Sequence, residues 1–301
     1  MDNTIRVFSG RTFCPEDIEL ISWAVKTYPT LPRGELISTI CELLDWTTPS
    51  GRAKFDRCSR FLDQLDSEGI VRLSPKQVRK PGMPIKLKVD KMDFDTTPIS
   101  GNLGSLKPIR LVIARVGEDL NRCRSYVDQY HTLGFKRPFG SRLQYFIKSG
   151  DLELGCIQFS ASSWALKDRD DWIGWNIEDK KQRLHLIINN SRYLIFPWVQ
   201  VKNLASKALS LAAKQIKDDW LREFCYAPVL LETFVDREHF EGTCYRAANW
   251  LYLGQTKGKG RNATSHKPDR SKKDIYVYPL EKNFRAYLNG EIPYKAVDPD
   301  E

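Results

Sequence analysis

The stretch YLIFPWVQVKNLASKALSLAAKQIKDDWLREFCYAPVLLETFVD, residues 193–236, decides the fold class. It begins with an apolar run at 193–201, which is typical of a buried strand. Residues 204–224 then repeat apolar side chains at helical spacing, and they predict a long amphipathic helix. A second apolar run at 229–236 predicts another strand. A strand, a helix and a strand in this order indicate an α/β arrangement.

The residues around this stretch continue the alternation of strands and helices. Strands are predicted at 109–116, 143–150, 152–162 and 274–280, and helices at 117–134 and 244–254. Gly150 and Asp151 are expected to form the turn of a hairpin. We therefore expect residues 109–301 to form a mixed α/β domain, with helices on both faces of the sheet.

The first 92 residues follow a different pattern. Apolar residues at helical spacing predict three short helices, at 15–28, 33–44 and 51–69. In the third helix the predicted apolar stripe consists of Phe55, Cys58, Leu62 and Leu65. Two strand-like runs follow, at 70–73 and 85–89. Three helices and a two-stranded wing are typical of the winged helix-turn-helix.

Residues 93–108 separate these two regions. They are rich in turn-forming residues and have no periodicity, which predicts a linker. The sequence thus predicts an α+β protein, in which a winged-helix DNA-binding domain at 1–92 precedes the α/β domain at 109–301.

The chain is basic, with a formal net charge of +9, and such a balance favours partners with phosphate backbones. The third predicted helix turns Arg57 and Arg60 away from its apolar stripe and carries Arg52 near its start. We interpret it as a DNA-recognition helix. The wing residues expected to meet phosphates are Lys76, Arg79 and Lys80. A solvated face or a protein contact is the alternative interpretation.

A second basic segment, KGKGRNATSHKPDRSKK, spans 257–273, and only Asp269 opposes its positive charges. Its predicted DNA-binding residues are Lys257, Lys259, Arg261, Lys272 and Lys273. We interpret the segment as a loop that follows phosphates, and an ordinary solvated loop is the alternative. Double-stranded DNA is the expected partner, with single-stranded DNA as the alternative.

Cysteine usage and hydropathy narrow the protein class. The seven cysteines include no CxxC pair, so the sequence predicts neither a metal site nor a disulfide framework. Buried thiols in a reducing cytoplasm are expected. No apolar run approaches the roughly 18–20 residues that span a bilayer, and the first residues lack a secretion pattern. We expect a cytoplasmic protein without membrane contact.

Three residues of the α/β domain are candidates for catalysis. Glu232 and Asp236 are four residues apart in a predicted strand, so both carboxylates are expected on one face of the sheet. Carboxylates at the end of such a strand suit a general base or a pair of metal ligands. The alternative is a salt-bridged Glu232 and an Asp236 that caps the next turn. His131 ends a predicted helix, where it suits either a general acid or base or a contact with the terminal carbonyls.

Weaker candidates lie nearby in the sequence. Cys244 begins a predicted helix, whose N-terminus lowers the pKa of a thiol, and a buried structural cysteine is the alternative. Asn189, Asn190 and Arg192 lie where a predicted helix gives way to a strand. They suit contact with a phosphate or a base edge, or closure of a turn.

Five phrases of the sequence resemble one protein family. They lie at 34–58, 130–150, 159–175, 189–210 and 230–261, and the last reads LLETFVDREHFEGTCYRAANWLYLGQTKGKGR. Together they resemble the Druantia anti-phage protein A family, which has transposase-like relatives. The resemblance implies a bacterial defence-associated protein that acts with other proteins, including a large helicase.

The C-terminal domain is also similar to the GNAT-type acyltransferase fold. The similarity rests on two strand-to-helix passages and on the phrase AANWLYLG at 247–254. Those enzymes bind the pyrophosphate of their cofactor at a Gly-rich turn between strand and helix. The corresponding turn here, VKNLAS at 201–206, has no glycine. The cofactor is therefore left unassigned.

The sequence supports one leading function and two alternatives. We expect a DNA-binding component of a bacterial anti-phage defence system that acts with partner proteins. The first alternative is a nucleic-acid-modifying or acyl-transferring enzyme with its site in the C-terminal domain. The second is an assembly module whose N-terminal helices recruit another protein.

Overall fold

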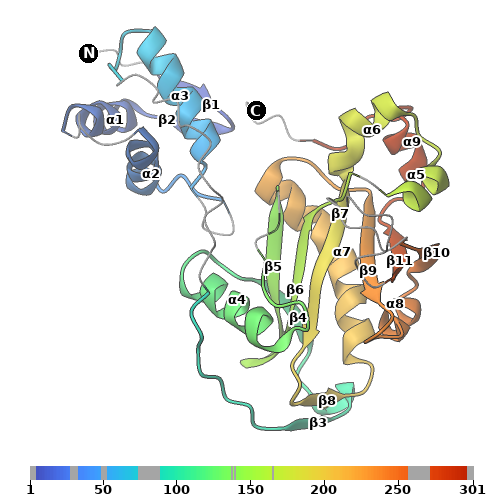
Figure 1. Ribbon diagram of the computed structural model, residues 1–301. Helices are drawn as coiled ribbons and strands as arrows, with labels where there is room; N and C mark the ends of the chain where they lie inside the picture. The colour runs from blue at the N-terminus through green and yellow to red at the C-terminus, as the bar shows by residue number, and fades with distance from the viewer. Residues whose placement is uncertain are drawn as a thin grey trace, which may run out of the picture. The chain divides into compact units, whose positions relative to one another are not determined.

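The computed structural model describes residues 5–27, 33–48, 53–73, 89–136, 138, 140–164, 166–256 and 272–296. The chain divides into two compact units, residues 1–87 and residues 88–296. Figure 1 shows the helices and strands of both units. Among the helices of the described residues, none has both the length and the apolar composition needed to span a bilayer.

The first unit contains the three predicted helices and a hairpin that the sequence did not predict. Its elements are β1 (Arg6–Phe8), β2 (Arg11–Phe13), α1 (Pro15–Thr27), α2 (Arg33–Leu43) and α3 (Phe55–Ser67). Phe13 of the hairpin stacks on Phe61 of α3, with 4.3 Å between ring centroids. Phe61 is buried, whereas Phe55, which was predicted to be on the apolar stripe, is 39% exposed. The core of α3 therefore forms around Phe61, and Phe55 lies at the edge, beside Gly34.

The chain after α3 turns back on the helix instead of forming a strand. Gly69 has a φ of 75°, and the Ile70 amide then donates to the Leu65 carbonyl, as in a Schellman cap. The Leu73 amide donates to the Asp66 carboxylate. These bonds explain why residues 70–73, predicted as the first wing strand, contain no strand. The remaining wing residues, 74–88, lie outside the described residues.

The second unit is built on a seven-stranded sheet in the order β10-β11-β9-β7-β6-β5-β4. Its strands are β4 (Ile109–Ile113), β5 (Arg142–Ser149), β6 (Leu152–Ala161), β7 (Ile187–Ile195), β9 (Leu230–Asp236), β10 (Leu251–Gln255) and β11 (Lys273–Pro279). All neighbouring strands are antiparallel except β7 and β9, which are parallel. The predicted hairpin turn at Gly150 and Asp151 is confirmed, because Ser149 pairs with Leu152.

Helices cover both faces of this sheet, as predicted (Figure 1). The contacts of two successive residues of β5 identify the helix on each face of the sheet. Gln144 lies against Cys123 of α4 (Glu118–Tyr130), whereas Tyr145 donates a hydrogen bond to Asp219 of α7 (Leu204–Phe224). Side chains alternate along a strand, so α4 and α7 lie on opposite faces. The long helix α7, which has the predicted bounds, is the crossover that makes β7 and β9 parallel.

Four shorter helices complete the second unit. They are α5 (Lys167–Ile173), α6 (Ile177–Arg183), α8 (Thr243–Ala247) and α9 (Phe284–Leu288), and a 3₁₀ turn η2 (Leu184–Leu186) follows α6. The predicted helix at 244–254 is wrong in its second half. Asn249 has a φ of 62°, which ends the helical turn, and the chain then pairs with β11 as β10.

The predicted linker at 93–108 is part of the second unit. It contains β3 (Ile99–Gly101), which pairs in parallel with β8 (Val199–Val201), and the 3₁₀ turn η1 (Leu103–Ser105). Phe94 stacks on Tyr126 of α4, with 3.6 Å between ring centroids. These contacts hold the segment against β8 and against α4.

Candidate functional site

A cleft in the second unit arises where β7 and β9 diverge. The two parallel strands pair only over residues 187–190 and 230–233, although β7 continues to Ile195 and β9 to Asp236. A cavity of about 490 Å³ lies at the carboxyl ends of these strands. Ligands collect at such positions in open α/β sheets. This cavity, which we call the β7/β9 cleft, has the size of a small-molecule site.

The lining of the β7/β9 cleft combines charged and apolar side chains. Its titratable residues include His131, Arg192, Asp236, Glu241, Cys244 and Lys273. Its apolar wall includes Tyr193, Ile195, Pro197, Phe234, Val235 and Phe240. Two of the three predicted catalytic residues, His131 and Asp236, thus line one cavity.

His131 is the C-cap residue of α4 and is a neutral imidazole at physiological pH. Burial, together with the charges of Arg192 and Lys273, lowers the pKa of His131 to about 4. The Nδ1 atom accepts a hydrogen bond from the Leu133 amide at 3.1 Å. The proton of the neutral ring is therefore on Nε2, where it can donate to a ligand. Among the described residues, the His131 ring makes no hydrogen bond with the last carbonyls of α4.

Arg192 and Lys273 give the cleft its positive charge. The Arg192 guanidinium donates to the carbonyls of Gly134 and Ser191, and burial lowers its pKa. Among the described residues, no carboxylate forms an ion pair with Arg192. Lys273 is directly opposite Asp236 in the pairing of β11 with β9, and Glu241 also lines the cleft, so two carboxylates oppose the two cations.

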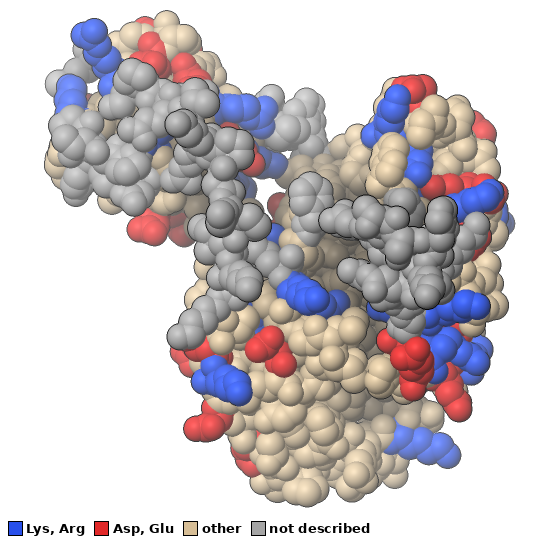
Figure 2. Space-filling model, viewed as in Figure 1, with Lys and Arg blue, Asp and Glu red and all other residues tan. Residues whose placement is uncertain are grey.

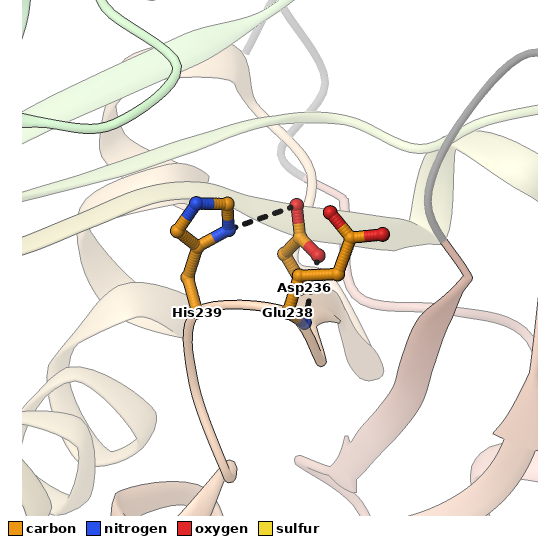
Figure 3. A group of neighbouring side chains, drawn as sticks. All are labelled: Asp236, Glu238 and His239. Atoms are coloured by element: carbon orange, nitrogen blue, oxygen red, sulfur yellow. Dashed lines mark hydrogen bonds and ion pairs between the residues drawn. The ribbon is translucent and has the colours of Figure 1, made fainter.

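Asp236 also organises the turn after β9. Its backbone carbonyl accepts from the amides of His239 and Phe240, and its carboxylate accepts from the Glu238 amide at 3.2 Å. Figure 3 shows the His239 ring directed at this carboxylate, with Nδ1 3.6 Å from an oxygen. Asp236, Glu238 and His239 bring their ligand atoms within 4.8 Å of one another. Such groups are common on exposed turns, and we assign no metal to them.

Glu232, the third predicted catalytic residue, does not line the cleft. Its side chain and that of Arg169 are fully buried, and they form an ion pair with 2.8 Å between nitrogen and oxygen. The second carboxylate oxygen of Glu232 accepts from the Ser163 amide. These are the contacts that the salt-bridge interpretation of Glu232 expects.

The buried ion pair belongs to a larger charge network under α5. Arg169 also contacts Asp170, and Asp170 accepts from the ammonium of Lys180 at 2.6 Å. The Lys180 ammonium lies 4.5 Å from the centre of the Trp164 ring. Two positive and two negative groups thus compensate one another in the interior, which is the condition for burying charge at tolerable cost.

A hydrogen-bonded group of side chains fixes the point where the strands diverge. The Tyr245 hydroxyl donates to the Asn190 side-chain oxygen at 2.7 Å, and the Thr233 hydroxyl donates to the Asn190 backbone carbonyl at 3.0 Å. Asn190 and Asn189 lie inside β7, with β6 on one side and β9 on the other. The predicted helix-to-strand boundary at these residues is wrong, because this pairing makes them part of a central strand.

Cys244 lines the cleft but is not an activated thiol. Burial raises the pKa of Cys244, which is opposite to the direction expected for a nucleophile at a helix N-terminus. The helix α8 has only five residues, so its dipole is short. A structural thiol is the interpretation that agrees with the raised pKa.

The predicted DNA-binding residues are only partly described. Arg60 is exposed on α3, on the side away from the buried Phe61 and Leu62, whereas Arg57 is half-buried and lies one helical turn before Phe61. Lys272 is exposed, and Lys273 begins β11. The remaining predicted residues lie outside the described residues: Arg52, Lys76, Arg79, Lys80, Lys257, Lys259 and Arg261.

A second cavity, which the sequence did not predict, lies beside the edge strand β10. It has a volume of about 340 Å³, and we call it the arginine–tyrosine cavity after its lining by Arg237, Arg246, Tyr252, Gln255, Asp274 and Tyr276. Asp274 follows Lys273 of the β7/β9 cleft in the same strand, and successive strand residues face opposite sides. Figure 2 shows basic side chains, with acidic ones below them, on the surface that carries α8 and β10.

Sequence comparison gives one family. The family model described as Druantia protein DruA matches residues 67–268, which is more than half of the chain. No curated protein matches the chain.

Comparison of structures gives acetyltransferases, the class to which the C-terminal sequence is similar. The apo RimL ribosomal L7/L12 alpha-N-protein acetyltransferase is 11% identical and has a TM-score of 0.31, with 46% of this chain and 70% of that chain covered. An N-acetyltransferase from Staphylococcus aureus Mu50 is 13% identical and has a TM-score of 0.39, with 58% and 100% covered. These TM-scores are too low to support a conclusion about fold, substrate or cofactor.

Proposed function

We propose that this chain, which belongs to the Druantia protein DruA family, is the DNA-binding component of an anti-phage defence system. Membership of the family makes it a component of such a system. Binding of DNA, and cooperation with other proteins of the system including a helicase, are the proposed part. The cytoplasm is the proposed location, because phage DNA is encountered there.

The observation that carries this proposal is the set of cationic side chains around the start of β11. Arg237 and Arg246 are exposed beside it, and Lys272 and Lys273 lead into the strand. The segment that joins Thr256 to Lys272 adds Lys257, Lys259, Arg261, Lys267 and Arg270 in sequence. Clustered cations of this kind bind phosphate backbones by releasing counterions.

The first unit would supply a second contact. Arg60 is exposed on the face of α3 opposite its buried side, where a recognition helix needs its contacts, and the half-buried Arg57 flanks it. We propose that residues 1–92 act as a winged-helix domain, with Arg52, Lys76, Arg79 and Lys80 contributing from outside the described residues. Double-stranded DNA is the partner that such a helix fits.

Fluorescence anisotropy with a labelled 20-base-pair duplex tests this function in the full chain. We expect R57E/R60E to weaken binding more than tenfold, because two phosphate contacts become repulsive. The matched control is K207E/K214E, which makes the same charge change on exposed positions of α7 and is expected to weaken binding less than threefold. Equal losses in both variants, or no binding by the unmodified chain at low salt, would overturn the proposal.

A second candidate function, an enzyme, is favoured by the β7/β9 cleft. His131 and Asp236, which are 105 residues apart in the chain, line one cavity there together with Arg192 and Lys273. A neutral donor beside two cations suits the stabilisation of negative charge that develops during a transfer reaction. A nucleic-acid-modifying or acyl-transferring activity is proposed on this basis.

Thermal unfolding with and without acetyl-CoA tests the acyl-transferring form of this candidate. A ligand that binds only the folded state raises the Tm. The expected result is a rise in Tm that R192Q abolishes. An unchanged Tm at millimolar acetyl-CoA would remove acyl transfer from consideration.

A further inference from the structure

The arginine–tyrosine cavity combines two tyrosine rings with two guanidinium groups. Tyr252 extends from the edge strand β10 and is 53% exposed, whereas Tyr276 beneath it is buried. Their ring centroids are 5.5 Å apart. Exposed aromatic rings beside cations are the surfaces on which unpaired bases stack. Tyr252 is about half exposed, and its ring contacts that of Tyr276 at an interplanar angle of 58°.

Buried contacts hold the polar groups of the cavity in place. The carboxylate of Asp274, which is 2% exposed, accepts from Arg237 at 3.2 Å and from the Gln255 amide nitrogen at 2.9 Å. With its amide nitrogen engaged, Gln255 keeps a carbonyl oxygen that can accept a hydrogen bond from an N–H group on a base edge, such as the ring N–H of thymine. Asp274 thus orients two side chains toward the opening at once.

Arg246 supplies positive charge at the cavity. Its guanidinium donates to the Tyr276 hydroxyl at 3.3 Å, and within the described part of the chain it pairs with no carboxylate. Arg237 has one carboxylate partner and a half-exposed side chain. Two guanidiniums against one buried carboxylate leave a net positive charge, which suits the phosphate that adjoins a stacked base.

We propose that the arginine–tyrosine cavity binds an unpaired nucleobase of single-stranded nucleic acid. The base stacks on Tyr252, Gln255 accepts from its edge, and Arg237 and Arg246 contact the neighbouring phosphates. A duplex cannot use this site, because its bases already stack on one another. The inference rests on the proposed nucleic-acid binding and names the form of nucleic acid that this site takes.

Anisotropy with two probes, a fluorescein-labelled 15-nucleotide oligothymidine and a hairpin duplex of similar charge, tests the inference in the full chain. We expect Y252A to weaken oligothymidine binding about tenfold or more, as loss of an aromatic stacking partner does. Y252F keeps the ring, and L251A changes the exposed neighbour on the same strand. Both are expected to change oligothymidine binding less than twofold, and Y252A to change duplex binding less than twofold.

The outcomes separate this inference from the proposed function. If the unmodified chain binds neither probe at low salt, both fail. If it binds and Y252A leaves oligothymidine affinity unchanged, only the stacking site is wrong. Two results would show that the cavity is a general anion-binding surface and not a base site. One is an equal loss of duplex affinity in Y252A, and the other is displacement of oligothymidine by polyglutamate at equal charge concentration. An unchanged Tm of Y252A shows that the fold is intact.

Discussion

The fully buried ion pair between Arg169 and Glu232 predicts that Glu232 has a structural role, which a substitution of Glu232 can test against a catalytic one. Replacing Glu232 by glutamine keeps its shape and leaves the Arg169 charge without its nearest buried partner. Breaking such a pair costs about 3–5 kcal/mol. Arg169 retains Asp170 at 2.7 Å, so we expect the lower end, about 3 kcal/mol.

Urea unfolding of the full chain, followed by tryptophan fluorescence, measures this loss. With an m-value of about 2 kcal/mol per molar urea, a loss of about 3 kcal/mol lowers the midpoint of the second unit's transition by about 1.5 M. D171N is the matched control, because Asp171 and Lys167 form an ion pair on the same helix with side chains that are 62% and 70% exposed. That variant is expected to lose less than about 0.5 kcal/mol.

Three results would refute this reasoning. One is an E232Q variant as stable as the original chain, and another is equal destabilisation by D171N. The third is an increase in stability, which is the usual result of removing a strained functional carboxylate. A double-mutant cycle with R169Q then gives the coupling directly, since the double variant should lose less than the sum of the single ones.

Three further predictions follow from the second unit. The pKa of His131 is about 4 in the folded chain and 6.5 ordinarily. The free energy of unfolding should therefore fall as the pH drops from 6.5 toward 4, and it should fall less in H131N. A midpoint near 6.5 in an NMR titration of His131 would contradict this prediction. Cys244 is half-buried and Cys14 is exposed, so the Cys244 thiol should react with a disulfide reagent more slowly than that of Cys14, as mass spectrometry of the labelled peptides can establish. A Cβ at Gly155 would lie 2.3 Å from the Leu194 carbonyl oxygen, so G155A should lower stability by about 1–3 kcal/mol, whereas an unchanged Tm would show that β6 and β7 separate without cost.

Patterns that depend on neighbouring residues predicted the fold of the second unit well. The apolar spacing of 204–224 gives α7 its bounds, and the Gly150–Asp151 turn gives the β5–β6 hairpin. Elements that depend on distant partners were missed. β10 exists because β11 pairs with it, and the preceding turn depends on the positive φ of Asn249, which sequence spacing does not reveal.

In the candidate sites, too, features that depend on residues distant in the sequence could not be predicted. The even spacing of Glu232 and Asp236 does not reveal that a buried Arg169 from α5 binds one of them. The convergence of His131 with Asp236 depends on where α4 ends beside β9. The arginine–tyrosine cavity draws on four separate segments of the chain, and sequence alone gives no reason to join them.

The most direct test of nucleic-acid binding is the salt dependence of the affinity of the full chain for single-stranded and double-stranded DNA. If Arg57, Arg60, Arg237 and Arg246 each contact one phosphate, log K should fall with log salt with a slope of about −3.6 on duplex DNA. A slope of that size, reduced by R237Q/R246Q, is the predicted result. A slope near zero, or no binding at low salt, would contradict the account.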